Sequence, residues 1–193
     1  FGLRWGCLAR ADQLLDQALV KTMSDAGCQY IDIGIESFDQ KILDDLRKDL
    51  KVELFSQAIA NLKKYNIEPK LNILVAASPL ETKATLKKTI SAAIRMRPAV
   101  IMFNIANPFP GNEFYLRAKE KVWLVFGDYV PVDVQKESVI QYPHLNKSTI
   151  EHIVKVANFK FYGNPAFIFA NWKKFLKPKI FIDSLKSLFK KLF

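Results

Sequence analysis

The chain has 193 residues, half of them apolar, and a formal net charge of +10 at pH 7. This length and apolar content are enough for one sizeable core and one domain, and they exclude a disordered tail. Its two cysteines cannot form a disulfide framework and are typical of a reducing cytoplasm. No apolar run approaches the roughly 18 residues that a membrane-spanning helix needs.

The N-terminal residues predict one β/α unit. The first residue is Phe, and no charged and then apolar leader precedes Trp5, so we expect a fragment of a longer chain without a signal peptide. A strand is expected to end at Arg10, and Asp12 to cap a helix that stops at Gly27 in the left-handed conformation. The apolar residues of this helix that share one face are Leu14, Leu15, Ala18, Leu19 and Met23.

The next strand carries the main site prediction. Alternating apolar residues from Tyr30 to Ile35 predict a buried strand, and Glu36 and Ser37 follow at its carboxyl end. In parallel α/β folds the carboxyl ends of the strands carry the chemistry, so these two residues indicate a site. Alternatively, they are the N-cap and first-turn acid of the following helix, where the helix dipole favours a carboxylate.

The rest of the chain repeats the order of strand and helix. A short helix is expected from Asp39, and longer helices over 52–65, 82–96 and 146–162, with a shorter one from Asn112. Strands are expected over 70–77, after the helix breaker Pro69, and over 99–104.

Four strand and helix units in succession argue for parallel pairing with right-handed crossovers. Four units do not close a barrel, so the outer side of the first strand should be an unpaired edge unless an upstream segment covers it. The predicted fold class is α/β, the C-terminal part of a TIM-type partial barrel with a helical C-terminal extension. The expected parts are barrel strands and helices over 1–120, an irregular extension and a helix over 121–163, and a basic amphipathic tail over 164–193.

Four short strings together resemble the radical S-adenosylmethionine (SAM) superfamily. The resemblance is to the cobalamin-dependent branch that includes anaerobic Mg-protoporphyrin ester cyclases and several methyltransferases, and it covers roughly Phe1 to Pro165. The strings are Trp5 to Asp12, Met23 to Cys28, Gly34 to Ser37 and Pro108 to Tyr115.

The resemblance implies cofactors and positions for them. A complete protein of this kind would use SAM and a [4Fe-4S] cluster, with cobalamin bound by an upstream domain. Glu36 and Ser37 would lie beside the ribose and amino-acid part of SAM, and Arg10 would face the same mouth, where a guanidinium can bind a carboxylate. A salt bridge from Arg10 to Asp12 or Glu36 is the alternative, and Asn104, at the end of the fourth strand, is a further candidate for cofactor binding.

The sequence also departs from the family pattern at two places. Relatives carry a Gly-x-Pro-x-Glu-Thr turn where this chain has residues 77–82, and Ala77 or Ser78 and Leu80 occupy the glycine positions. The Cys-x-x-x-Cys-x-x-Cys triad that binds the cluster is absent, and neither Cys7 with Cys28 nor the two lone histidines can replace it. The chain alone is therefore expected to hold no metal and to be inactive.

Two functions follow from these observations. The first is the C-terminal part of a radical SAM enzyme of the methyltransferase or cyclase type, whose partner is the upstream half of the same protein. The alternative is a non-catalytic half-barrel that binds an anionic membrane surface through Lys173 to Phe193, because residues 158–193 carry eight lysines and one aspartate. Both predict a cytoplasmic protein, peripheral to the membrane in the second case, and neither the substrate nor a nucleic-acid partner is indicated.

Overall fold

The computed structural model describes residues 2–169. The chain forms two compact units that divide between Asn104 and Ile105. The predicted end of the barrel part at residue 120 stays a prediction. In chain order the elements are β1 (Trp5–Ala9), η1 (Gln13–Leu15), α1 (Gln17–Asp25), β2 (Cys28–Glu36), α2 (Gln40–Asp45), α3 (Leu54–Lys64), β3 (Glu68–Val75), α4 (Lys83–Arg95), β4 (Val100–Ile105), α5 (Glu113–Glu120) and α6 (Lys147–Tyr162).

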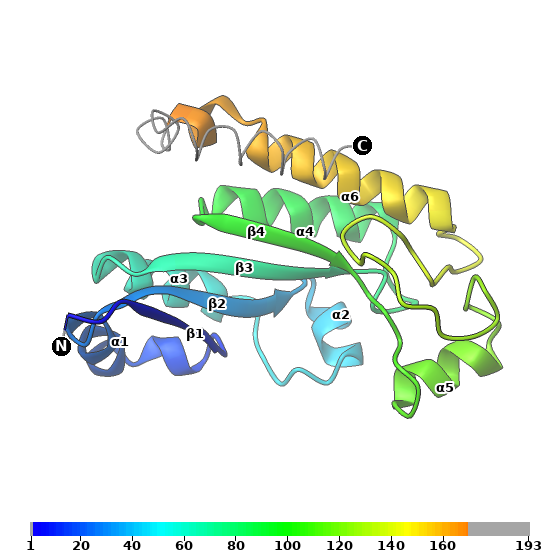
Figure 1. Cartoon of the computed structure of the whole chain (residues 1–193), viewed down its shortest axis with the longest axis horizontal. Coiled ribbons are helices and arrows are strands. Elements are labelled where there is room, and N and C mark those ends of the chain that lie inside the picture. The colour runs from blue at the N-terminus through cyan, green and yellow to red at the C-terminus, as the bar shows by residue number, and fades with distance from the viewer. Residues whose placement is uncertain (1, 170–193) are drawn as a thin grey trace. The chain divides into compact units, whose positions relative to one another are not determined.

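The four strands form one sheet in the order β1-β2-β3-β4, so each strand lies beside its neighbour in the sequence (Figure 1). β1 pairs with β2, and β2 with β3, in parallel. Each crossover contains helical segments, as parallel pairing requires. The predicted α/β class with parallel strands is confirmed.

The two faces of this sheet differ in burial. Ile31, Ile33 and Ile35 of β2 are fully buried, and Leu71 and Ile73 of β3 are buried with them. Figure 1 shows helices α3 and α4 behind the strands. We assign the buried residues to the side that packs on these helices, because they alternate with partly exposed ones along each strand. We call the other side the inner face, and it is defined by Leu8, Tyr30, Asp32, Gly34, Lys70, Asn72 and Leu74.

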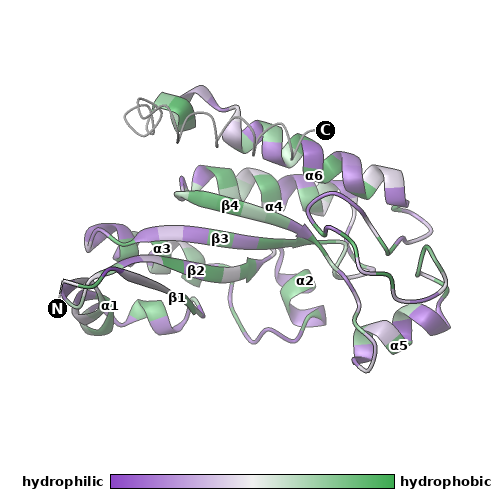
Figure 2. Cartoon of the chain, in the orientation of Figure 1, coloured by the Kyte–Doolittle hydropathy of each residue, from purple (hydrophilic) through white to green (hydrophobic). Residues whose placement is uncertain are grey.

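The inner face is more polar and more exposed. Its residues on β2 and β3 are partly exposed, and Leu8 on β1 is 79% exposed. Figure 2 shows hydrophilic segments along β3, where Glu68, Lys70 and Asn72 alternate with apolar residues. Because side chains alternate between the two sides of a strand, this pattern fits a sheet with one apolar side packed on helices.

The first helical segment differs from its prediction. Asp12 does cap a helix, but only the short 3-10 helix η1, and Asp16 then starts α1 by accepting hydrogen bonds from Ala18 N and Leu19 N. This break rotates the expected apolar stripe, so Val20 is buried while Leu19 is exposed. Gly27 follows α1 with φ +93°, as predicted for a helix stop.

β3 begins earlier than predicted. Pro69 was expected to precede the strand, but it lies inside β3 and pairs with Ile31 of β2. Proline cannot donate a ladder hydrogen bond, which suits a position near the start of a strand. Its carbonyl still accepts a hydrogen bond from Ala99 N at 2.9 Å.

The described part of the second unit contains α5 and α6. Asn112 and Asn146 cap these helices through their side chains, as the sequence indicated for both starts. The irregular segment between the helices contains two isolated bridges, Leu124 with Ile140 and Tyr142 with Leu145. Residues 170–193, most of the predicted basic tail, lie outside the described residues. Within 2–169 no helix is long and apolar enough to cross a bilayer.

Candidate functional site at the carboxyl ends of the strands

Glu36 ends β2 with its carboxylate folded back over the inner face. Its Oε1 forms an ion pair with Lys48 Nζ at 2.7 Å, and the Glu36 side chain is 11% exposed. A Cβ added at Gly34 would lie 2.9 Å from this Oε1 and 3.8 Å from the Lys48 ammonium. The pair therefore lies directly over Gly34, and the absence of a side chain there makes room for it.

Arg10, which follows β1, holds the loop that carries Lys48. Its guanidinium donates to the Lys48 carbonyl at 3.2 Å and to the Asp49 carbonyl at 3.5 Å. The same group pairs with both carboxylate oxygens of Asp12, at 3.2 and 3.3 Å. This hydrogen bond from Arg10 is the main cause that lowers the pKa of Asp12. The structure thus contains the salt bridge from Arg10 to Asp12 that was the alternative to a cofactor-binding role for Arg10. The Arg10 side chain remains half exposed.

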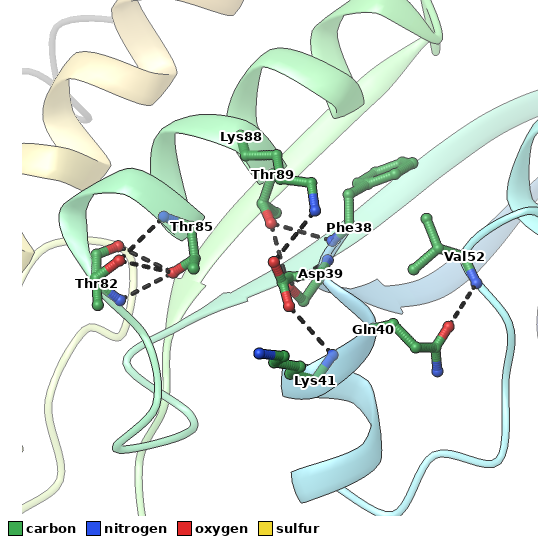
Figure 3. A network of polar contacts seen from close by, with 10 residues as sticks. Phe38, Asp39, Gln40, Lys41, Val52, Thr82, Thr85, Lys88 and Thr89 are labelled. Atoms are coloured by element: carbon green, nitrogen blue, oxygen red, sulfur yellow. Dashed lines mark hydrogen bonds and ion pairs between the residues drawn. The ribbon is translucent and has the colours of Figure 1, made fainter.

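Ser37 lies next to Glu36, but its hydroxyl is used inside the protein. Ser37 is buried, its Oγ lies 3.1 Å from Thr89 Oγ1 of α4, and it accepts a hydrogen bond from Asp39 N. Thr89 Oγ1 also accepts from Phe38 N at 3.0 Å. Figure 3 shows Thr89 at this junction between α4 and the start of α2. This position stabilises the loop after β2 and turns Ser37 away from the inner face.

Asp39 is the N-cap of α2, so Glu36 does not have the capping role of the alternative interpretation. The Asp39 carboxylate accepts from Lys41 N at 3.1 Å and pairs with Lys88 Nζ of α4 at 3.2 Å (Figure 3). Asp39 and Thr89 together hold α2 against α4. The loop that follows Glu36 is therefore fixed by contacts with both α2 and α4.

Glu81 organises the turn that follows β3. Its buried carboxylate accepts hydrogen bonds from three successive backbone groups, Ala76 N, Ala77 N and Ser78 N, at 2.8, 3.0 and 3.3 Å. Ser78 Oγ donates to Asp45 Oδ2 of α2 at 2.6 Å. Burial raises the pKa of Glu81 to about 7, although the three backbone donors act to lower it.

This turn adopts its shape without the glycines of the relatives. Among residues 76–82 the left-handed conformation falls on Ala76, with φ +60°, and not on Ala77, Ser78 or Leu80. The conformation at these three positions therefore does not require glycine. A matching left-handed residue, Glu36 with φ +59°, ends β2.

Asn104 is the penultimate residue of β4 and is partly exposed, between buried Phe103 and Ile105. It is therefore on the opposite side of its strand from these two apolar residues. The structure brings Glu36 and Arg10 together through Lys48, whereas Ser37 belongs to the Thr89 network and Asn104 lies on another strand.

The described residues do not offer a site for an iron-sulfur cluster. Within 2–169 there is no group of three or more Cys, His, Asp or Glu side chains that could hold a metal ion. Cys7 and Cys28 are free thiols, and burial raises the pKa of both, which disfavours the thiolate that a metal needs.

Lys48 was missed at the sequence level because nothing in Arg47-Lys48-Asp49 distinguishes it from other charged loop residues. Thr89 was missed because it looks like any polar residue of an amphipathic helix. Glu81 could have been found, since it stands at the acidic position of the Gly-x-Pro-x-Glu-Thr turn.

Comparisons with known proteins find relatives for part of this chain. No protein-family model matches the chain. An uncharacterized methyltransferase of Pyrococcus horikoshii is 24% identical over 166 residues, which are 84% of this chain and 35% of the relative. The anaerobic magnesium-protoporphyrin IX monomethyl ester cyclase of Rubrivivax gelatinosus is 27% identical over 122 residues, which are 63% of this chain and 22% of the cyclase.

One solved structure shows a likeness in fold. The radical S-adenosylmethionine methyltransferase TsrM of Kitasatospora setae, with cobalamin and a [4Fe-4S] cluster bound, superposes with a TM-score of 0.56 at 16% identity. The likeness covers 78% of this chain and 30% of TsrM. The predicted resemblance to the radical SAM superfamily is confirmed. The chain spans about a third or less of the length of the relatives it matches.

Proposed function

We propose that the chain is the C-terminal, SAM-binding part of a radical SAM enzyme of the methyltransferase or cyclase type. The observation that carries the proposal is the Glu36 and Lys48 ion pair, closed over Gly34 at the carboxyl end of β2. Relatives with these activities support it, and TsrM suggests a cobalamin-dependent member.

The residues of this site fit the chemistry of SAM. SAM carries ribose hydroxyls and an ammonium group that can donate to Glu36, and a carboxylate that can accept from Lys48 or from the half-exposed Arg10. Gly34 provides space where a Cβ would meet the Glu36 carboxylate. Bound SAM would supply the carbon–sulfur bond that a reduced cluster cleaves, and Glu36, Lys48 and Arg10 would fix the orientation of SAM. Ser37 supports the loop behind Glu36.

The cluster must come from outside the described residues. β1 is an edge strand of the sheet within residues 2–169, where a preceding parallel strand would pair, and we propose the upstream half of the same protein as the source of the cluster. Anaerobic reconstitution of the isolated chain with iron and sulfide should therefore leave no stoichiometric cluster. A stable protein with about four irons per chain would contradict this assignment.

A chimera tests the proposed SAM site. The upstream part of the Pyrococcus horikoshii relative is joined ahead of Phe1, and SAM affinity and reductive SAM cleavage are measured under anaerobic conditions. Glu36→Ala should weaken SAM binding by about 1.5–3 kcal/mol, as for a lost hydrogen bond to a charged group. Asp25→Ala, which removes an exposed carboxylate on α1, is the matched control. Unchanged SAM affinity in the Glu36 variant would refute the binding role.

A further inference from the structure

The inner face carries a second acidic side chain below the Glu36 and Lys48 pair. Asp32 lies two residues before Gly34 on β2 and shares its side of the strand. At about 3.3 Å per residue, Asp32 is roughly 7 Å further from the carboxyl end of the strand. A ligand that reaches past Gly34 along this face would meet the Asp32 carboxylate next.

This carboxylate is incompletely satisfied. Its Oδ1 is buried and has no hydrogen-bond partner among the described residues. A buried acceptor without a donor is uncommon in folded proteins and costs stability. A donor supplied by a ligand would remove this cost.

The lysine beside Asp32 on the neighbouring strand is engaged elsewhere. Lys70 pairs in register with Asp32 on the neighbouring strand, yet its ammonium lies over the ring of Tyr30, 3.1 Å from the ring centroid. Tyr30 in turn lies against Gly6, where a Cβ would collide with the ring. Tyr30 thus holds the Lys70 ammonium by a cation–π contact, which directs it away from the Asp32 carboxylate.

We propose that Asp32 binds a protonated amine of the substrate on the inner face. This inference rests on the proposed function, because only an enzyme has a substrate to bind here. It narrows the class of substrate to amines. Charge complementarity supports it, because a cation with N–H donors matches an acidic acceptor beside a lysine that is already engaged. The neighbouring Asn72, which pairs with Gly34, adds an amide that can both donate and accept. A tetrapyrrole macrocycle has no ammonium group and would place an apolar ring over the charged row of Asp32 and Lys70.

Two probes that differ in one group test the inference on the full chain. Benzylamine is protonated at pH 7, and benzyl alcohol has nearly the same shape without the charge. Each is titrated into the ¹⁵N-labelled protein, and the backbone amide shifts of Asp32, Gly34 and Lys70 are followed. We expect saturable shifts with benzylamine and an affinity for benzyl alcohol that is weaker by about tenfold or more, the effect of a hydrogen bond to a charged group.

Three variants separate recognition from general charge effects. Asp32→Asn should abolish the preference for the amine, while Asp32→Glu, which keeps the charge, should retain part of it. Asp25→Asn, at an exposed carboxylate of α1, should leave the preference unchanged. Well-dispersed spectra of each variant show that it folds.

Several results would overturn the inference. Equal affinity for the two probes would do so, as would a preference that persists in Asp32→Asn. The titration is repeated with the chimera, and loss of the preference there would show that Asp32 instead pairs with a side chain of the upstream half. Failure of the proposed SAM site would appear separately, as unchanged SAM affinity in Glu36→Ala.

Discussion

Lys48 and Glu36 form an ion pair whose atoms Nζ and Oε1 lie 2.7 Å apart, directly above the Cα of Gly34. Lys48 reaches this position because Arg10 donates to its carbonyl group from the end of β1. The pair therefore links residues that follow β1, end β2 and lie between α2 and α3. Its position depends on a glycine whose backbone conformation any residue could adopt, since φ at Gly34 is not positive.

Replacing Gly34 by alanine should separate this ion pair without unfolding the protein. The added Cβ meets the flexible end of Glu36, which can move, so we expect less than about 1 kcal/mol of lost stability. The coupling between Glu36→Gln and Lys48→Met, about 0.5–1 kcal/mol for a partly exposed pair, should fall to near zero in the Gly34→Ala background. Urea unfolding of the four variants in each background measures it. Equal coupling in both backgrounds would show that the pair does not depend on Gly34.

Thr89→Val should destabilise the protein by about 1–3 kcal/mol, because it leaves the buried Phe38 N–H without its acceptor and removes the partner of the Ser37 hydroxyl. Valine has nearly the same shape, so packing is conserved. Thr22→Val, on the exposed side of α1, removes a hydroxyl that donates only to its own helix and should stay within about 0.5 kcal/mol. Equal effects of the two substitutions in urea unfolding would contradict the supporting role of Thr89.

The regular elements could be predicted from the sequence because their signals are local. Alternation in β2, side-chain caps at Asp39, Thr82 and Asn146, and the left-handed Gly27 each depend on a few adjacent residues. The break between η1 and α1 was missed because Asp12 and Asp16 are both good caps. Both act as caps, Asp12 for η1 and Asp16 for α1.

The candidate site was predictable only in part. Glu36 stands at a strand end, and that position follows from strand alternation alone. Its partner Lys48 comes from a loop with two left-handed residues, Arg47 and Asp49, and no sequence pattern places that loop over the strand. Ser37 was predicted to face a ligand. It lies one residue after Glu36, and its side chain turns toward Thr89 of α4 instead.

Ala76→Gly and Ala77→Gly should differ in their effects on stability. Ala76 has a left-handed conformation that costs alanine about 1 kcal/mol and costs glycine nothing, whereas Ala77 does not. Both methyl groups are buried, so the loss of burial is similar. We expect Ala76→Gly to be more stable than Ala77→Gly by about 1 kcal/mol in urea unfolding. The reverse order would show that strain at Ala76 is not relieved by glycine.

Binding of the basic segment Lys173 to Phe193 to membranes stays a prediction from the sequence. Its lysines alternate with apolar residues, and each lysine near an anionic surface is worth roughly 1 kcal/mol at low salt. The full chain should sediment with phosphatidylserine vesicles at low salt and be released at high salt. A chain that ends at Asn171 is the control. Equal sedimentation of the two chains would exclude the segment as a membrane anchor.

Glu81 should make stability depend on pH in a direction opposite to that of an ordinary paired carboxylate. Burial raises its pKa in the folded protein to about 7, above the ordinary value of 4.5 that applies in the unfolded chain. The stabilisation by its proton is therefore fully present below pH 4.5 and is lost as the pH rises through 7.

An amide at this position cannot titrate, so Glu81→Gln isolates the effect. Relative to this variant, the unfolding free energy of the wild-type protein should fall by roughly 2–4 kcal/mol between pH 4.5 and 8. Urea unfolding over a pH series measures the difference, and Glu53→Gln, at an exposed carboxylate that makes no cap hydrogen bond, is the matched control. A difference that grows with pH would mean that the backbone donors of Ala76, Ala77 and Ser78 outweigh burial. In that case Glu81 would hold the turn after β3 as a carboxylate across the whole range.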